Sequence, residues 1–232
     1  MAASICFQEQ IEIPFFHSLA RFRAWATSDD CPDKARIDYI AGRIEVDMSP
    51  EDLYTHGNLK TRLITVLGTL LEETDLGEPF SDCTRISSPE ADLSSEPDIV
   101  VILHESLETG RVRLVPKASG EADRYVEFEG TPDLVVEIVS DGSVAKDTQR
   151  LPEAYWRAGI PEFWLADARG SELVFRIHRT GSVGYEPAPS DSEGFQYSAV
   201  LNQRFRLLRH RRRTGRWAYA LERKSSQDGK AG

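Results

Sequence analysis

The sequence predicts an α/β fold in which a mixed central β-sheet is flanked by helices. Two short apolar runs, at residues 99–103 and 134–139, have the continuous hydrophobic pattern of strands that are buried on both faces. A longer segment, residues 53–73, repeats apolar residues at helical spacing and is expected to pack on that sheet. Because the chain has 232 residues and no internal repeat, we expect a single domain, residues 1–232, with its core at about 37–180.

The first half of the chain is expected to form a helix, a hairpin, the long helix and a strand. Helical spacing of apolar residues identifies the first helix, and alternation around Gly42 identifies the hairpin. Ser49 and Pro50, followed by two acidic residues, are typical of a helix start. The expected ranges are a helix at 14–27, a hairpin at 36–48, the long helix at 49–73, a strand at 80–88 and an acidic loop at 89–96.

The second half is expected to add one short helix and several strands. Proline is tolerated best in the first turn of a helix, so Pro152 predicts a regular helix that begins near Leu151 and ends at Gly159. The other expected elements are a surface excursion at 106–122, an edge strand at 125–129, strands at 162–167 and 172–178, a loop at 181–194, closing strands at 197–208 and 216–221, and a disordered tail at 224–232.

The composition predicts a cytoplasmic protein rather than a secreted or membrane protein. Cys6, Cys31 and Cys83 are scattered without metal-ligand or disulfide spacing, which suits a reducing compartment. The sequence shows neither a secretory signal pattern nor an apolar segment long enough to span a bilayer. The formal net charge of −10 counts against broad nonspecific binding to nucleic acid, unless the positive charge is gathered on one face.

Glu137 is the most unusual residue of the predicted core, because it interrupts the apolar run at 134–139. A buried carboxylate is costly unless it is paired or binds a metal. Asp133 would share the strand face of Glu137 but lies four residues away, roughly 13 Å, so the two cannot easily chelate one ion. Asp98, beside the other run, can lie next to Glu137 if the strands are neighbours. Such a pair suits a hard divalent cation such as Mg²⁺; the alternative is that arginine or backbone donors satisfy both acids.

Three segments within the range of about 37–179 carry further motifs in a specific order: DYIAGRIEVDMSPEDLYTHGNL, EPDIVV and PDLVVEIVSDGSVAKDTQRLPEAYWRAGIPEFWLAD. Together they resemble a bacterial family of restriction-endonuclease-like proteins (Uma type) in the PD-(D/E)XK nuclease superfamily. The resemblance implies a restriction-endonuclease-like fold and a phosphodiesterase site that depends on Mg²⁺ or Mn²⁺. It also implies DNA as the substrate and a homodimer as the assembly.

The same resemblance implies that Asp98 and Glu137 bind the metal and act in catalysis together with a basic residue. The superfamily pattern has a lysine two residues after the second acid, where this chain has Val139. Lys146 and Arg150 are the bases available on the following helix, so Lys146 is the expected catalytic cation and Arg150 the second choice. The alternative for Lys146 is a surface ion pair with its acidic neighbour, which would contribute little.

Three other residues are weaker candidates for the site. Glu51 stands at the start of the long helix, where superfamily members sometimes carry an acid that assists the metal. His56 lies on the apolar stripe of that helix, where a histidine is also an ordinary core residue. Asp133 follows Pro132 at the start of a strand and is expected mainly to bond local backbone groups.

An arginine-rich run, RFRLLRHRRRTGR, occupies residues 204–216 and holds seven arginines in thirteen residues. Such a run is typical of a phosphate-binding strip, but it also suits a strand edge that is protected from aggregation by charge. Three functions therefore remain open. One is a metal-dependent endonuclease that hydrolyses phosphodiester bonds of DNA, and the second is a catalytically inactive nucleic-acid-binding or scaffold protein that retains the nuclease fold. The third is a dimeric stress or mobile-element accessory protein without nucleic-acid contact.

Overall fold

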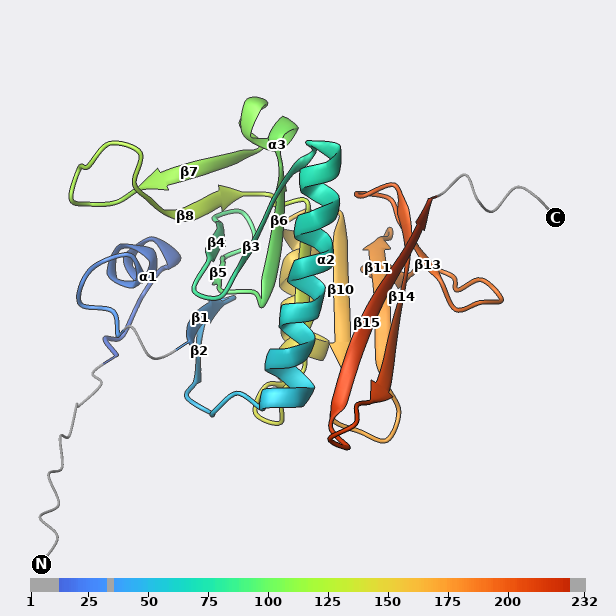
Figure 1. Ribbon diagram of the computed structural model, residues 1–232. Coiled ribbons are helices and arrows are strands. Elements are labelled where there is room, and N and C mark those ends of the chain that lie inside the picture. Colours follow the sequence, from blue (N-terminus) through green and yellow to red (C-terminus); the bar gives the residue numbers. More distant parts are fainter. Residues whose placement is uncertain (1–12, 33–35, 226–232) are drawn as a thin grey trace, which may run out of the picture.

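The two acidic strands lie side by side in the middle of a six-stranded sheet. In the computed structural model, which describes residues 13–32 and 36–225, this central sheet has the spatial order β12, β11, β10, β9, β6, β3 (Figure 1). β9 pairs with β10 in parallel and the other neighbours pair antiparallel, so the predicted mixed central sheet is confirmed. The bounds are β3 (Gly77–Ser81), β6 (Ile99–Leu103), β9 (Leu134–Ile138), β10 (Glu162–Asp167), β11 (Val174–Thr180) and β12 (Tyr185–Pro187).

One helix covers each face of the central sheet. α2 (Asn58–Thr74) lies in front of the sheet in Figure 1, and α4 (Leu151–Arg157) begins at the expected residue and covers the opposite face. Alternate residues of β9 divide between the two layers: Val136 belongs to the core cluster under α2, and Val135 belongs to the cluster under α4. Each fully buried apolar side chain contributes on the order of 2 kcal/mol, which explains why this strand is apolar on both faces.

A second six-stranded sheet lies on the left of Figure 1 and has the order β2, β1, β5, β4, β8, β7. The predicted hairpin at 36–48 forms its edge, and α1 packs Phe22 against Tyr39 of that hairpin. The helix is shorter than expected, because the Ser18 hydroxyl caps it four residues inside the predicted range. The bounds are α1 (Leu19–Ala26), β1 (Arg36–Ile40), β2 (Arg43–Asp47), β4 (Arg85–Ser88), β5 (Leu93–Ser95), β7 (Val112–Pro116) and β8 (Tyr125–Gly130).

Most of this second sheet differs from the sequence prediction. The single strand expected at 80–88 is wrong, because Asp82 and Cys83 adopt left-handed φ angles of 40° and 54° and turn the chain from β3 to β4. The other wrong expectations share one cause, since short polar strands lack the apolar pattern by which strands are recognised. The expected loop at 89–96 contains β5, and the loop at 181–194 contains β12. The excursion at 106–122 contains the end of α3 (His104–Glu108) and all of β7, and β8 lies inside the sheet rather than at its edge.

The last strands form a third sheet instead of joining the central one. β13 (Gln196–Ser198), β14 (Gln203–Arg211) and β15 (Trp217–Ser225) pair antiparallel, and their apolar residues complete the core beside α2. The expected strand at 197–208 is therefore divided between β13 and β14. The tail expected at 224–232 begins too early, because β15 continues to Ser225; residues 226–232 lie outside the described part of the chain. No described helix is both long and apolar enough to cross a bilayer.

A single π-helical turn precedes each of the helices that cover the central sheet. η1 (Leu53–Gly57) leads into α2, and η2 (Lys146–Arg150) leads into α4. The helix start expected at Ser49 is wrong, because Asp52 caps η1 by accepting hydrogen bonds from two backbone N–H groups of the turn. π-Turns are rare and often mark functional sites, and each of these two turns carries a predicted site residue.

Asp133 connects the start of β9 to the end of β6. Its carboxylate accepts hydrogen bonds from the Leu103 backbone N–H at 2.8 Å and the Ser106 hydroxyl at 2.7 Å, and it also pairs with Arg111. We expect Asp133→Ala to lower the free energy of unfolding by about 3 kcal/mol, because these donors lose their acceptor. Urea unfolding followed by circular dichroism measures the change.

Asp141→Ala is the matched control for this prediction. The Asp141 side chain is 95% exposed and pairs with Arg169 at 3.2 Å, so its removal should change the unfolding free energy by less than about 1 kcal/mol. If Asp133→Ala were as stable as the wild type, the structural role of this carboxylate would be wrong.

Candidate active site

Asp98 and Glu137 meet where the antiparallel pair of β6 and β9 ends. Ile99 is opposite Val136 in this pair, so the next residues in register are Asp98 and Glu137. Both side chains are about 1% exposed. The backbone N–H of Ile138 donates to Asp98 Oδ2 at 2.8 Å, which ties the two strands together at this point. The structure thus places the two acids together on neighbouring strands.

Three cationic or titratable side chains surround Asp98. The Arg36 guanidinium lies 3.1 Å from Oδ1, the His56 Nε2 lies 3.3 Å from Oδ2, and the Lys60 Nζ lies 3.7 Å from Oδ1. Burial alone would raise the pKa of Asp98, but the hydrogen bond with His56 and the positive charges of Arg36 and Lys60 hold it well below its ordinary value. Asp98 is therefore a buried carboxylate that stays ionised.

The π-turn η1 brings His56 between Asp98 and Glu51. The three residues each offer one ligand atom, and these atoms lie within 4.8 Å of one another. Glu51 contacts His56 Nδ1 and accepts a hydrogen bond from Lys60 Nζ at 2.5 Å. Burial acts to lower the pKa of His56, but the hydrogen bond and charge of Asp98 and the charge of Glu51 raise it overall. Two carboxylates and an imidazole at this spacing form a donor set that fits a divalent metal ion.

Glu137 lies in a second group of buried residues, which includes Tyr155, Lys146 and Asp147. The Tyr155 hydroxyl donates to Glu137 Oε1 at 2.5 Å. Burial, followed by repulsion from Asp147 and Asp98, raises the pKa of Glu137 well above its ordinary value, although Lys146 acts against this shift. Glu137 therefore favours the protonated form when no further positive charge is bound beside it.

Lys146 is buried and forms an ion pair that links two distant parts of the chain. Its Nζ donates to Asp38 Oδ2 at 2.9 Å, across 108 positions of the sequence. Asp38 is held in turn by the backbone N–H of Glu96 at 2.9 Å. Lys146 also interacts electrostatically with Glu137, so its charge acts on the acidic pair although it does not touch Asp98. The alternative of a surface pair with its acidic neighbour does not describe this arrangement.

Asp147, the next residue of η2, is also buried. The Ser143 hydroxyl donates to Oδ2, while Oδ1 has no hydrogen-bond partner among the described residues. Burial raises the pKa of Asp147 to about 7, even though Lys146 and the Ser143 hydroxyl act to lower it. The π-turn thus inserts a lysine and an aspartate side by side into the protein interior.

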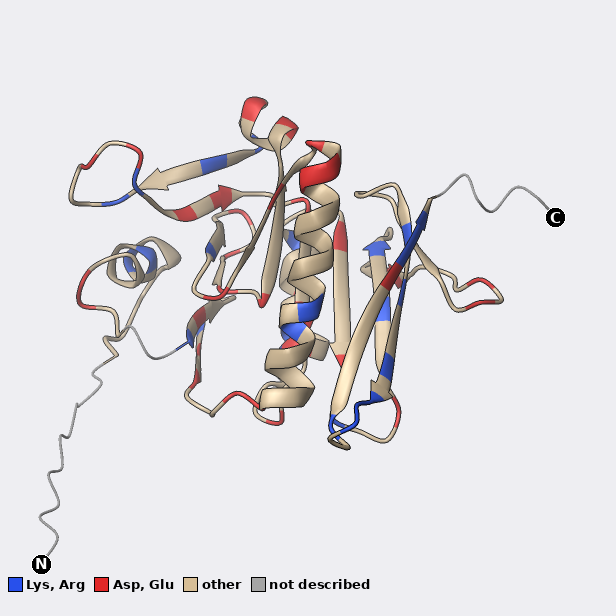
Figure 2. Cartoon of the chain, viewed as in Figure 1, with Lys and Arg blue, Asp and Glu red and all other residues tan. Residues whose placement is uncertain are grey.

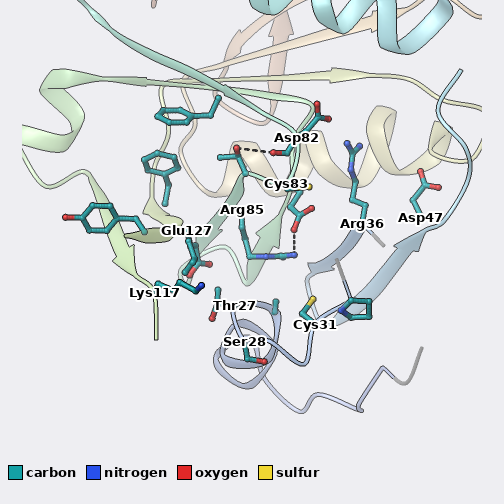
Figure 3. A pocket seen from close by; sticks show the side chains of 18 of the residues that line it. Thr27, Ser28, Cys31, Arg36, Asp47, Asp82, Cys83, Arg85, Lys117 and Glu127 are labelled. Carbon is teal, nitrogen blue, oxygen red and sulfur yellow. Dashed lines mark hydrogen bonds and ion pairs between the residues drawn. The ribbon is translucent and has the colours of Figure 1, made fainter. Parts of the chain in front are cut away.

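These groups lie at the base of a cleft of about 1110 Å³. The residues of this site that line the cleft are Arg36, Glu51, His56 and Lys60. Figure 3 shows Arg36 at the wall of the cleft, and Arg85 is another arginine of its lining. Asp98, Glu137 and Lys146 are not among its lining residues and lie beneath them. Among the described residues, the lining contains five Lys or Arg and eight Asp or Glu side chains, so a ligand in the cleft would meet Arg36 and Lys60 within a wall of mixed charge.

Two of the predicted site residues lie apart from this group. Arg150 pairs with Glu45 of β2, with Nε and Oε1 2.6 Å apart, and no described ion pair joins it to Asp98 or Glu137. Asp133 precedes β9 at the opposite end of the strand from Glu137, and its carboxylate accepts a hydrogen bond from the Leu103 backbone N–H at the end of β6. Neither residue contributes to the wall of the cleft.

Sequence reasoning missed several members of the site. Asp38 is an acid inside the apolar strand run RIDYI, which is the same signal that identified Glu137. Lys60 follows His56 by four residues, so the two share a helix face. Nothing in the sequence pattern indicates Arg36 or the burial of Asp147, because both depend on which distant elements pack over them.

The fold and the buried acids beside the cleft define a restriction-endonuclease-like protein. A family model described as "Uma2: Putative restriction endonuclease" matches residues 19–209, so the chain belongs to this family, and the resemblance of the motifs is confirmed. A crystal structure of a "putative nuclease belonging to DUF820" from Anabaena variabilis ATCC 29413 is similar, with a TM-score of 0.54 and 18% identity over 76% of this chain and 90% of that one. This likeness confirms the predicted fold class. No curated protein matches the chain.

Asp147 makes the stability of the protein depend on pH. Its folded-state pKa of about 7 lies above its ordinary value of 3.8, so the folded protein binds more protons than the unfolded chain between these values. The stabilising effect is complete below pH about 4 and is lost as the pH rises through 7. We expect the unfolding free energy of the wild type, relative to Asp147→Asn, to fall by on the order of 4 kcal/mol over this window.

Urea unfolding of both proteins in EDTA, at several pH values, measures this difference. Asp141→Asn removes an exposed carboxylate six residues earlier and should follow the wild-type curve. If the difference in unfolding free energy between the wild type and Asp147→Asn were the same at every pH, Asp147 would not titrate in this window.

Proposed function

We propose that this chain is a divalent-metal-dependent endonuclease that hydrolyses phosphodiester bonds of DNA. The observation that carries the proposal is the position of Asp98, which is next to Glu137 in the β6–β9 register and contacts His56, beside a cleft that Arg36, Glu51, His56 and Lys60 line. Membership of a family described as restriction endonucleases supports the same reaction class. The expected homodimer and the cytoplasmic location stay predictions.

The metal ion is proposed to bind Asp98, the residue shared by both groups. Glu137 completes the site predicted by the sequence, and His56 and Glu51 offer further ligand atoms in the geometry of the structure. Because the set contains an imidazole as well as carboxylates, it suits Mn²⁺ at least as well as Mg²⁺. A bound ion of this kind supplies Lewis-acid polarisation of the phosphate at the site.

The protein's own residues account for the remaining needs of phosphodiester hydrolysis. Arg36 and Lys60 line the cleft and are placed to bind the anionic oxygens of a phosphodiester. Glu137, whose pKa burial raises, is expected to ionise and serve as a ligand when the charge of the metal is bound beside it. The Tyr155 hydroxyl orients this carboxyl group. Lys146 acts through Glu137 and stabilises negative charge beside it.

A specific observation favours the alternative of an inactive protein that retains the fold. Val139 replaces the lysine of the superfamily pattern, and the Lys146 ammonium is already paired with Asp38 away from the cleft. Incubation of plasmid DNA, linear duplex DNA and RNA with Mg²⁺, Mn²⁺ or EDTA decides between the two functions. Cleavage that requires the metal supports the nuclease, and intact substrate under every condition supports the inactive protein.

Metal binding can be measured without turnover. We expect Mn²⁺ and Mg²⁺ to raise the melting temperature of the wild type, because an ion that binds only the folded state stabilises it by about 2.7 kcal/mol at one hundred times its Kd. Asp98→Asn should abolish this rise, and Glu137→Gln and His56→Gln should each reduce it. Differential scanning calorimetry in EDTA and in each metal gives the shift.

Asp141→Asn is the control for loss of an acidic side chain at the surface and should keep the full metal response. A full response in Glu137→Gln with a lost response in His56→Gln would place the ion among Glu51, His56 and Asp98 alone. An equal response in the wild type and Asp98→Asn would place the metal elsewhere and contradict the proposal.

The role of Lys146 needs a variant that leaves no unpaired buried charge. Removing Lys146 alone would strand Asp38, which typically costs several kcal/mol. We therefore use the double variant Asp38→Asn/Lys146→Met and expect cleavage to slow by about a hundredfold or more, roughly 3 kcal/mol of transition-state stabilisation. Single-turnover cleavage rates measure the effect, and the metal-induced rise in melting temperature should persist.

Glu45→Gln/Arg150→Met removes another ion pair from the same π-turn and serves as the matched control. It should cleave at close to the wild-type rate. If Asp38→Asn/Lys146→Met cleaved at the wild-type rate, the catalytic role assigned to Lys146 would be wrong. If both double variants lost cleavage rate equally, the π-turn rather than the lysine charge would be needed.

A further inference from the structure

The tip of the β14–β15 hairpin carries arginines that the fold does not use. Arg212, Arg213 and Arg216 are exposed and lie in the connection between Arg211, where β14 ends, and Trp217, where β15 begins. None of the three forms an ion pair with a carboxylate within residues 13–32 and 36–225. Figure 2 shows basic residues gathered at this tip, at the lower end of the two long strands.

The other arginines of the same hairpin have partners. Arg206 pairs with Glu222 at 2.5 Å and Arg204 lies 3.9 Å from Asp191. Arg209 donates to the carbonyl groups of Ala168, Gly170 and Ser171. Within the described part of this hairpin, Arg212, Arg213 and Arg216 are therefore the arginines whose side chains have neither a hydrogen bond nor an ion pair, and residues 203–217 contain no acid at all. Because the three tip arginines lie beyond the ladder of paired strands, protection of a strand edge does not account for them.

The tip is built to hold its shape. The Arg211 guanidinium lies 3.5 Å from the centre of the Trp217 ring, and it donates to the Gly215 carbonyl at 2.7 Å. Arg209 lies over the same ring at 4.3 Å. Cation–π contacts and hydrogen bonds of this kind order a turn, so the free arginines are presented from a fixed position.

The tip adjoins the π-turn that carries His56. Arg216 lies 5.8 Å from the centre of the Tyr54 ring, and Tyr54 is two residues before His56 in η1. Leu53 and Tyr54 of this turn are 78% and 39% exposed, so an exposed aromatic ring and an exposed aliphatic side chain accompany the tip arginines. Basic residues interleaved with an exposed aromatic ring are typical of a surface that binds nucleic acid.

We propose that the hairpin tip binds the phosphate backbone of duplex DNA whose scissile bond lies in the cleft, an inference that rests on the proposed nuclease function. A duplex carries one negative charge for about every 1.7 Å of its axis, so DNA held at the site presents further phosphates to the adjoining tip. The net charge of −10 would oppose DNA over most of the surface, and the tip concentrates attraction at one place.

The experiment measures binding of a fluorescent DNA duplex by anisotropy in EDTA, with salt from about 50 to 200 mM. Arg212→Ser/Arg213→Ser/Arg216→Ser should weaken binding and reduce the slope of log K against log salt by about 2 to 3 units, since each lost phosphate contact accounts for about 0.9. Lysine at the same three positions should retain the slope. The matched control, Arg157→Ser/Arg176→Ser/Arg179→Ser, removes the same charge from exposed positions on α4 and β11 and should leave the slope nearly unchanged.

An unchanged slope in the tip variant, or an equal reduction in the control, would overturn the proposal. Loss of binding to RNA or to anionic vesicles without loss of duplex binding would also overturn it, because the tip would then serve another partner. The measurement needs no cleavage. A protein that never cleaves but shows the expected slopes would refute the nuclease function alone, and normal cleavage with unchanged slopes would refute the role of the tip alone.

Discussion

The buried carboxylate of Asp98 is the interaction on which the arrangement of this protein depends. It bonds the backbone of β9 through Ile138, and it is balanced by Arg36 from β1 and by His56 and Lys60 from the η1–α2 segment. An isolated charge in this position would cost far more than a protein of this size can offset. The acid therefore requires the second sheet, the main helix and the central sheet to meet at one point, and the cleft opens above that point.

The two π-turns explain how helices that mainly serve the core also supply polar groups to the site. A regular turn continued from α2 or α4 would keep its residues in phase with the apolar stripe that faces the sheet. The wider π-turn changes this phase for one turn, so that η1 places His56 beside Asp98 and η2 buries Lys146 and Asp147 near Glu137. Both turns lie at the start of a helix, where the following regular turns hold them in place.

Charge in this protein is organised as paired networks in the interior and at the cleft. In the interior, Lys146 pairs with Asp38, and Arg36 pairs with Asp98. Of these cations Arg36 also lines the cleft, where basic and acidic side chains are mixed. The arginines of the C-terminal sheet are largely used to bond the fold, and only the hairpin tip leaves them unpaired among the described residues. Net charge therefore describes solubility here, whereas the local arrangement decides what the surface attracts.

The sequence by itself determined the elements whose pattern is strong, namely β6, β9, α2, α4 and the β1–β2 hairpin, because continuous apolar runs, helical periodicity and turn residues are local properties. The anomaly of an acid at Glu137 is also visible in the sequence, whereas its meeting with Asp98 was conditional on β6 and β9 being neighbours, which the tertiary structure decided. Only the tertiary structure decided the short polar strands of the second sheet and the separate C-terminal sheet, whose stability comes from pairing with distant segments. It also decided that Lys146 pairs with Asp38, 108 positions away, and that Arg36 faces Asp98. The partner of a buried charge is chosen by packing in three dimensions, and no local pattern in the chain encodes it.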